Sequence, residues 1–393
     1  MANFFDIPAR PEADADVAVA IGRVAVFETI ADALPDWSRL EAAPGGSAYQ
    51  SRAFALAWLR HLDDGAAPLI VVGYDSADRP AALLPLALVR RGPVRLAVFA
   101  GARHSNLNLP LCRPGVCATP QSARSLLQAA ARLARRPPDL FLLLNQPRLW
   151  NGAPNGFALI DPHAAPSNAY GAVIGADAKG FLERAQSKAA RKKLRAKAGK
   201  LAEIGVVRVE RATDADRART ILSTFIEQKT QRFAGKGKDA GVTGLAARAF
   251  YDALATDAAH GGPALDLYAL SVDGRIAATY GGLARQGRWH GLFNSIATSP
   301  DIARYSPGDL LLRELILDLG ARGIEAFDLG VGEARYKAAI CDETIELADV
   351  ALPVTMLGRI WAPVEIARRD LKRRVKQTPW ALSFVERMRA GQA

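Results

Sequence analysis

The sequence predicts an α/β protein in which one unit occurs twice, each copy a mixed twisted sheet flanked by helices. Residues 68–89 and 265–284 both have the pattern strand, turn, strand. Residues 122–147 and 308–333 both have the pattern helix, break, strand, and each follows its hairpin. Elements that recur in the same order indicate a duplication. With 393 residues the chain is long enough for two or three domains.

The two hairpins share their turn chemistry. The second hairpin turns at Asp273-Gly274, a strong signal for a tight turn between two strands. The first turns between Asp75 and Arg79, and both turns are followed by Ala-rich apolar residues. The likeness lies in the pattern of residue types.

The domain division follows from composition. Residues 1–18 are rich in Ala, Asp and Pro and predict a flexible leader. Pro, Asn, Gly and Ala concentrate between 160 and 178, which predicts a boundary there. We therefore expect an N-terminal half at 19–165, a C-terminal domain at 178–355, and a basic helical tail at 356–393.

Helices dominate the start of the second half. Residues 181–205 contain no Pro and predict one helix, followed by a second at 214–233 and a third at about 243–259. Residues 235–241, GKGKDAG, predict a flexible loop. The stretch 187–200 holds seven Lys or Arg and no acid. It suits a phosphate-rich partner, although a solvated helix face is the commoner role of such a run.

The charge balance favours acidic partners. The formal net charge is +11 and the isoelectric point about 9.8. Phosphorylated cofactors, nucleic acid and anionic lipid all fit this surplus. No apolar run reaches the roughly 18 residues of a membrane span, and the first residues lack the features of a signal peptide. Three cysteines, an odd and sparse count, predict a reducing, cytoplasmic location and no zinc site.

One helix start has the features of an anion site. Ser306 is expected as the N-cap of a helix with a buried apolar stripe, and Asp309 follows at capping-box spacing. Gly308 would leave the first-turn amides open to a diphosphate, with Arg304 or Tyr305 alongside. The alternative is an ordinary capped helix, because Asp309 adds negative charge where a phosphate would bind.

Two further stretches carry candidate chemistry. Residues 327–342 run from a strand into a Gly-rich turn with Glu333, Tyr336 and Lys337, which suit a base, an acid and an anion clamp. The strand at 291–300 carries Asn294, and its amides suit an oxyanion if they are locally unpaired. A solvated loop and the open face of a strand are the respective alternatives.

A polar cluster with His104 and Asn106 follows a strand of the first half and is placed to line a cleft between the halves. A lone His is more often a hydrogen-bonded structural residue than a catalyst. The sequence contains no P-loop, no GxGxxG after a strand and no spacing typical of a metal site.

At this point the sequence resembles a known family. Residues 180–342 resemble the GNAT-type acyltransferase domain of CelD-like proteins, which are associated with bacterial cellulose and other exopolysaccharide biosynthesis. The resemblance rests on the basic helix at 187–205, on YALSVDGRIAATYGGL, on RYSPGDLLLRELI and on FDLGVGEARYK. The first half is similar through AYQSRAFALAWLRHL, so nearly all of 30–345 is covered.

The resemblance implies two GNAT-like halves side by side, as in Fem-type aminoacyltransferases, with acetyl-CoA or a longer acyl-CoA as donor and an amine or hydroxyl as acceptor. The diphosphate would lie at the helix start at 304–309 and the pantetheine arm near Asn294. Glu333 would be the base, Tyr336 would protonate the leaving thiolate, and Lys337 would hold negative charge. The acceptor cleft would contain the side chains His104, Asn106, Lys229 and Arg232.

One motif departs from the family pattern. GNAT pyrophosphate loops commonly have the form Q/R-x-x-G-x-G/A, whereas Arg304 to Gly308 has the form R-x-x-x-G, one residue longer.

Two other classes of protein stay open. A Fem-type enzyme would take its aminoacyl group from tRNA, and the basic stretch 187–200 would contact RNA. A non-catalytic member of the fold would use the basic tail to dock on a membrane or on a polysaccharide synthase.

Overall fold

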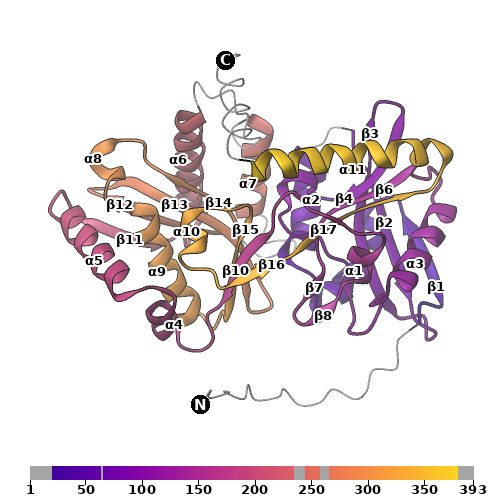
Figure 1. Ribbon diagram of the computed structural model, residues 1–393, viewed down its shortest axis with the longest axis horizontal. Coiled ribbons are helices and arrows are strands. Elements are labelled where there is room, and N and C mark those ends of the chain that lie inside the picture. Colours follow the sequence, from indigo (N-terminus) through magenta and orange to yellow (C-terminus); the bar gives the residue numbers. More distant parts are fainter. Residues whose placement is uncertain (1–19, 63–64, 234–243, 257–264, 379–393) are drawn as a thin grey trace.

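The computed structural model describes residues 20–62, 65–233, 244–256 and 265–378. The predicted leader at 1–18 and the predicted loop at 235–241 lie outside these residues, as do the last 15 residues of the basic tail. The described residues form two α/β halves that lie side by side (Figure 1).

The first half contains a mixed sheet whose strands lie in the order β1-β2-β3-β4-β6. Neighbours are antiparallel except β4 and β6, which are parallel. Alternate residues of β2 enter two different cores, Ile70 on one face and Val71 on the other, so the strand is apolar throughout. The elements are β1 (Arg23–Phe27), α1 (Ile30–Ala42), α2 (Arg52–His61), β2 (Ala67–Tyr74), β3 (Pro80–Arg91), β4 (Val94–Phe99), β5 (Leu111–Cys112), α3 (Pro120–Leu133) and β6 (Leu140–Pro147).

The second half repeats this order with β11-β12-β13-β14-β15, again antiparallel except for the parallel last pair. The predicted duplication is therefore confirmed. Helix α9 covers one face of this sheet through buried Leu311, Leu315 and Leu319. The elements are β11 (Val207–Arg211), α6 (Ala215–Phe233), α7 (Leu245–Thr256), β12 (Leu265–Val272), β13 (Arg275–Arg285), β14 (Arg288–Ile296), α8 (Pro300–Ala303), α9 (Pro307–Ala321), β15 (Ala326–Val331) and α10 (Arg335–Ala338).

Each sheet gains a strand that is distant in sequence from its other strands or lies in the link between the halves. Strand β10, which precedes the second half, pairs antiparallel with β15, whereas β17, which follows it, pairs antiparallel with β6 of the first sheet. Sheet membership therefore crosses the division expected between residues 165 and 178. The connecting elements are β7 (Leu149–Trp150), β8 (Ala153–Pro154), β9 (His163–Ala164), β10 (Ala169–Val173), β16 (Glu343–Ile345), β17 (Leu347–Pro353) and α11 (Met356–Gln377).

The helix predicted at 181–205 is wrong as a single element. The chain forms α4 (Ala178–Ala185) and α5 (Lys188–Ala202), with a break between them. Ser187 causes the break, because its hydroxyl accepts a hydrogen bond from the amide of Ala190 and so begins a new helix. The basic side chains belong to α5.

The halves pack through aromatic side chains. Helix α2 of the first half lies against α7 of the second. The ring of Phe54 on α2 meets the ring of Phe250 on α7 edge to face, with the centroids 5.4 Å apart. Phe54 also meets Tyr49 edge to face, with the centroids 5.3 Å apart. Among the described helices, none combines the length and the apolar character needed to cross a bilayer.

Candidate active site

The central feature of the second half is a gap between two parallel strands. Strands β14 and β15 pair only from Arg288–Ala326 to His290–Asp328, although β14 continues to Ile296. Opposite β13 the register shifts at this same point, which leaves Leu292 as an extra residue in β14. Such a bulge bends a strand and ends its pairing. The two strands therefore diverge after His290, and their main-chain groups border an open space.

A cavity of about 280 Å³ occupies this gap. Five residues that the sequence singled out line it, and they come from three elements (α6, β14 and α10) and one loop. Its lining consists of Asn106, Phe225, Lys229, Phe233, Gly291, Leu292, Phe293, Asn294, Leu329, Val331, Tyr336 and Lys337.

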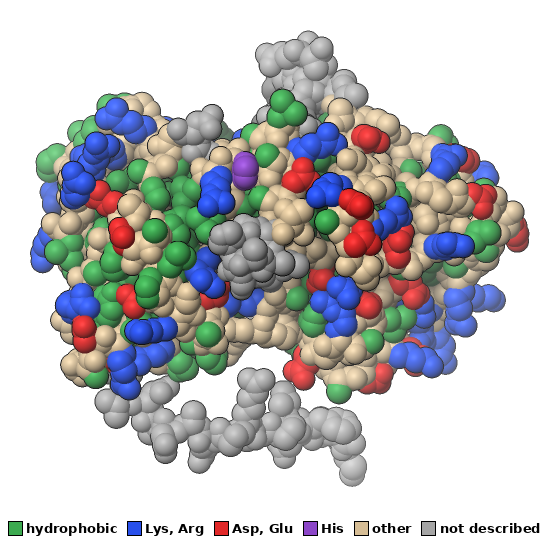
Figure 2. All heavy atoms as spheres, turned by 180° about the vertical axis from the view of Figure 1, so that it is seen from behind, with side chains coloured by type: hydrophobic (Ala, Val, Ile, Leu, Met, Phe, Trp, Pro, Cys, Tyr) green, Lys and Arg blue, Asp and Glu red, His purple; other side chains and the backbone are tan. Residues whose placement is uncertain are grey.

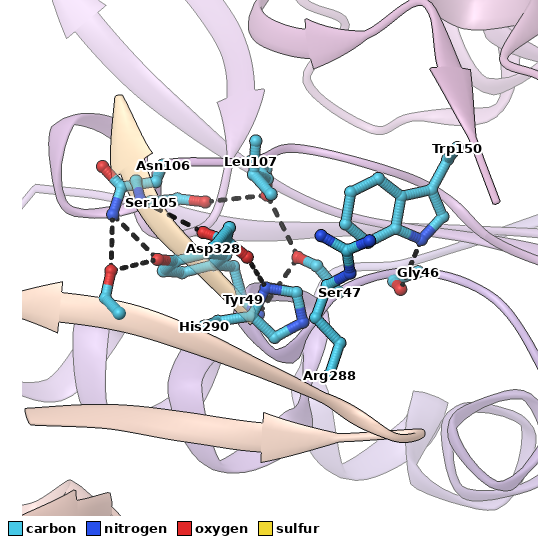
Figure 3. A network of polar contacts seen from close by, with 12 residues as sticks. Gly46, Ser47, Tyr49, Ser105, Asn106, Leu107, Trp150, Arg288, His290 and Asp328 are labelled. Carbon is cyan, nitrogen blue, oxygen red and sulfur yellow. Dashed lines mark hydrogen bonds and ion pairs between the residues drawn. The ribbon is translucent and has the colours of Figure 1, made fainter. Parts of the chain in front are cut away.

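Asn106 of the first half holds the gap open (Figure 3). Its Nδ2 donates to the carbonyl of Gly291 on β14 (3.2 Å), and its Oδ1 accepts from the amide of Val331 on β15 (3.4 Å). The side-chain amide thus replaces a main-chain link between the strands. Gly330 makes room for it, because a Cβ there would lie 2.5 Å from Nδ2 of Asn106. The hydroxyl of Tyr49 also donates to Gly291 (3.2 Å).

In the first half, the equivalent gap between β4 and β6 is closed by hydrogen bonds from Asn108, a residue of the same half. Strands β4 and β6 pair only at Leu96–Leu140 and Ala97–Phe141. Beyond this point Asn108 donates from its main chain to Asn145 O (3.1 Å) and from Nδ2 to Leu144 O (2.8 Å). Two asparagines of one loop thus serve the two gaps, and the cavity lies in the second.

Two lysines of the cavity are poised to lose their protons. Burial, together with the charge of the nearby Arg232, lowers the pKa of Lys229 to about 8. Burial also lowers the pKa of Lys337 to about 8. The Nζ of Lys337 donates to the carbonyls of Gly330 (2.9 Å) and Val331 (3.2 Å), so this lysine fixes the turn that ends β15.

Tyr336 remains protonated at neutral pH. Burial raises its pKa to about 12, and a hydrogen bond with Asn294 opposes the shift. The same Asn294 also hydrogen-bonds Tyr280, whose pKa burial raises as well. A hydroxyl that keeps its proton at neutral pH is a hydrogen-bond donor toward the cavity.

Glu333 lies outside the residues that line the cavity. Its exposed carboxylate accepts hydrogen bonds from Ser167 (3.1 Å) and Tyr170 (3.4 Å). Its charge still acts on Lys337, where it opposes the lowering of the pKa. Glu333 therefore stands at the border of the cavity, held by the segment that leads into β10.

The start of α9 differs from its prediction in two respects. Ser306 adopts a left-handed conformation (φ 54°, ψ 53°) and makes no side-chain cap, so the predicted capping box with Asp309 is wrong. Its hydroxyl instead accepts a hydrogen bond from Lys197 of α5 (2.5 Å). The amides of Asp309 and Leu310 both donate to the carbonyl of Ser306.

Gly308 is needed for packing. It is buried, and a Cβ there would lie 2.7 Å from Cδ1 of Ile296 on β14. The glycine therefore allows α9 to pack closely on β14, and its role in exposing the first-turn amides stays a prediction. Arg304 lies over the ring of Tyr305, 4.9 Å from its centroid, and Lys197 adds a cation that the sequence did not single out. Partial burial raises the pKa of Asp309, and the charge of Lys197 opposes this.

The other two residues expected in the acceptor cleft lie outside the cavity lining. The ring of His104 lies 5.9 Å from that of Phe250, in the contact between the halves. Arg232 is exposed, and its charge lowers the pKa of both Lys229 and Tyr336. Arg232 therefore lies close enough to influence the cavity without lining it.

A buried ionisable pair lies where the strands separate (Figure 3). Nδ1 of His290 is 2.6 Å from Oδ2 of Asp328, and both side chains are at most 1% exposed. Trp150 stacks on His290, with the ring centroids 6.0 Å apart. The sequence analysis missed this pair. A His in an apolar strand and the Asp of FDLG were its only signals, and their contact depends on the parallel pairing of β14 with β15.

A larger cavity, of about 730 Å³, lies in the first half between β1 and α3. Its lining is mainly apolar or small and includes two arginines, Arg23 and Arg132. Arg23 is already engaged with Asp78 and Tyr74. The smaller cavity is the better candidate because amides, amines and a phenol converge on it.

Comparisons with known proteins agree with the fold. Residues 188–338 match the family described as the acetyltransferase (GNAT) domain. A comparison of the sequence with curated proteins found no match.

Three solved structures share the architecture over most of both chains. FemX is 10% identical, with 84% of this chain and 98% of FemX covered and a TM-score of 0.61. A conserved protein from Bacteroides thetaiotaomicron is 14% identical (84% and 100% covered, TM-score 0.53). The C-terminal DUF2156 domain of an Agrobacterium fabrum protein is 12% identical (86% and 95% covered, TM-score 0.52).

These identities show a common fold and nothing finer. Residues 188–338, in the second half, are similar to the GNAT acetyltransferase domain, and the chain as a whole shares its fold with FemX. The predicted tandem GNAT architecture is confirmed. The narrower resemblance to CelD-like proteins stays a prediction.

Proposed function

We propose that the protein is an acyltransferase that moves an acyl group from acyl-CoA to an amine. The observation that carries this proposal is the cavity between the diverging strands β14 and β15, inside the segment that matches the GNAT domain. A gap between two strands offers main-chain amides to a thioester carbonyl, and Asn294 lies beside it. Acetyl-CoA or a longer acyl-CoA fits this chemistry.

The donor's diphosphate would lie near the start of α9. Because the amides of Asp309 and Leu310 are used within the turn, cations have to supply more of the binding. Lys197 and Arg304 are the cations at this end of the helix. The positive end of the helix dipole adds to their attraction.

The chemical step is a displacement at the thioester carbon. The acceptor nitrogen attacks the carbonyl carbon, the carbon–sulfur bond breaks, and the amine loses a proton. Tyr336 donates a hydrogen bond to the departing sulfur, which suits a phenol that stays protonated. Lys229 is the proposed base, since it lines the cavity and burial lowers the pKa of its amine to about 8. Glu333 is the second candidate, acting from the border through water.

The acceptor is proposed by chemical class. An amine suits the superfamily, and a hydroxyl is the second choice. The resemblance to CelD-like proteins makes amines and hydroxyls of cell-envelope or exopolysaccharide precursors the first acceptors to test. Such an acceptor would approach past Arg232 and Asn106.

Binding of the donor is tested by thermal unfolding with candidate donors. We expect acetyl-CoA or a longer acyl-CoA to raise the unfolding midpoint, because a ligand bound only by the folded state stabilises it. Release of free CoA thiol on addition of amines then measures turnover. A midpoint raised by aminoacyl-tRNA and by no acyl-CoA would instead favour the Fem-type function. The exposed Lys188, Lys192 and Lys193 of α5 are the feature that would serve it.

Tyr336→Phe separates catalysis from binding. We expect kcat to fall about 10- to 100-fold with the binding of acyl-CoA unchanged, because the lost hydroxyl acts on the leaving sulfur. Full turnover by this variant would remove Tyr336 from the mechanism.

A further inference from the structure

Helix α11 is apolar on two opposite faces. Its inner face covers the first sheet: Ala362 is buried against Leu96 and Leu140. Gly358 lies so close to β6 that a Cβ would meet the carbonyl of Asp139 at 1.7 Å. In Figure 1 the helix lies across the strands of the first half. This packing fixes which residues of α11 face outward.

The outward face carries an apolar stripe. Met356 and Ile360 are both 67% exposed, Val364 is 51% exposed and Leu371 is 63% exposed. Steps of three, four or seven residues keep side chains on one face of a helix, so these four form a continuous row. The exposed residues within this row, Pro363 and Ala367, are also uncharged. We call Met356, Ile360, Val364 and Leu371 the outer stripe.

Cations flank the outer stripe, and the acids of α11 are neutralised. Glu365 is buried and paired with Arg91 and with Arg368 (3.0 Å). Asp370 is paired with Arg373 (3.2 Å). Of the exposed cations of the helix, Arg359, Arg368 and Arg374 border the outer stripe, whereas Lys372 and Lys376 lie farther round the helix.

The combination of exposed apolar and basic side chains distinguishes α11 from the basic helix α5, whose residues include no large exposed apolar side chain. On the face seen in Figure 2, basic and acidic side chains are interleaved over both halves. The surface of α11 combines exposed apolar side chains with charge of one sign.

We propose that α11 docks the protein on a lipid bilayer that contains anionic lipid. An apolar row with basic flanks is the pattern of a helix that lies in the plane of a membrane interface. The row would enter the acyl-chain boundary, and the flanking cations would meet lipid phosphates. A second copy of the chain is a poorer occupant, because stripe-to-stripe packing would bring two sets of cations together.

Docking would also orient the cavity. Near the end of α11, Lys376 donates to Ser167 (2.9 Å), which donates to Glu333 (3.1 Å) at the border of the cavity. The charge of Lys376 acts on Lys337, which lines the cavity. Helix α11 is thus linked to the border of the cavity through Lys376 and Ser167. The docking proposal does not depend on the proposed acyl transfer.

Vesicle flotation of the full chain tests the proposal. We expect binding to phosphatidylcholine vesicles that contain about one third phosphatidylglycerol, much weaker binding to phosphatidylcholine alone, and loss of binding at about 1 M salt. The double variant Ile360→Ser/Leu371→Ser should bind at least about 10-fold more weakly. Arg359→Gln/Arg374→Gln should also bind at least about 10-fold more weakly, because two cations beside the stripe would no longer attract lipid phosphates.

Leu245→Ser is the matched control, since Leu245 is an exposed leucine (87%) on α7. It should bind vesicles like the unchanged protein, and all variants should keep the unfolding midpoint because the altered side chains are exposed. Equal binding by the stripe variant, or no binding by the unchanged protein, would overturn the proposal. A concentration-dependent dimer that the stripe variant abolishes, without any vesicle binding, would assign the stripe to a second copy and overturn it too.

Discussion

At the residue scale, the site depends on an amide side chain that stands in for main-chain hydrogen bonds. Asn106 links Gly291 of β14 to Val331 of β15, and Asn108 bonds the equivalent edge of β6 in the first half. Both come from one short loop. Their likeness makes each the control for the other.

Asn106→Ala should damage the site more than the fold. Loss of a buried hydrogen-bonding partner costs about 1–3 kcal/mol of stability, since the groups left behind lack partners. We expect kcat/KM for acyl transfer to fall at least about 10-fold as the strands lose their spacing. Unfolding and steady-state assays measure the two effects. Asn108→Ala should cost similar stability and leave kcat/KM within about twofold; equal losses of activity in both variants would contradict the role of Asn106.

The pKa of Lys229 predicts a pH profile. Burial disfavours the ammonium form, so the pKa lies at about 8 and the neutral amine gains population as the pH rises from 7 to 9. If Lys229 is the base, kcat/KM rises over this range and then levels off. Arg232→Gln should move the rise to higher pH, because the charge of Arg232 lowers this pKa.

Substitution of each candidate base decides between them. Lys229→Gln should abolish the alkaline rise, whereas Glu333→Gln should preserve it. If Lys229→Gln keeps the pH profile of the unchanged protein, Lys229 is not the general base. If only Glu333→Gln loses activity, the carboxylate of Glu333 is the general base.

At the scale of single elements, sequence patterns predicted positions better than contacts. Asn294, Tyr336 and Lys337 were singled out because they follow or occupy strands, and all three line the cavity. The hydrogen bonds of Asn106 and the contact of His290 with Asp328 join segments far apart in the chain. No local pattern contains such contacts, so sequence alone missed them.

The start of α9 shows a local rule overridden by packing. A serine before Pro and Gly predicts a side-chain cap, but Ser306 is left-handed and bonds Lys197 instead. Such a conformation costs a non-glycine residue about 1–2 kcal/mol, which tertiary contacts must offset. The close approach of Gly308 to Ile296 is one of these contacts.

Lys197→Gln tests the cation at this helix start. We expect KM for acyl-CoA to rise about 3- to 10-fold with kcat little changed, because a charge–phosphate contact contributes to binding before and during the reaction alike. The effect should shrink at high salt. Lys193→Gln, an exposed position on the same helix, should leave KM unaltered, and an equal rise there would indicate only a general charge effect.

At the scale of the whole molecule, the exchange of strands makes the halves interdependent. Strand β17 completes the first sheet from the end of the chain, and β10 reaches the second sheet from the link between halves. Composition predicts a boundary at 160–178, whereas the exchange of edge strands is decided by tertiary pairing, which composition does not contain.

Separated halves should therefore fail to fold. Residues 1–165 would lack β17, leaving β6 with an unpaired edge beside buried Leu142 and Leu143. We expect this fragment to aggregate or to show no cooperative unfolding by circular dichroism, whereas the full chain unfolds in one transition. A soluble fragment with its own sharp transition would contradict this interdependence.

The most direct measurement is calorimetric binding of a non-hydrolysable acyl-CoA thioether to two cavity-filling variants. Val331→Trp fills the gap between β14 and β15, and Leu133→Trp fills the larger cavity of the first half. If the gap holds the donor, Val331→Trp weakens binding at least about 10-fold, or 1.4 kcal/mol, and Leu133→Trp leaves it unchanged. Unchanged affinity in Val331→Trp with loss in Leu133→Trp would contradict the placement of the donor.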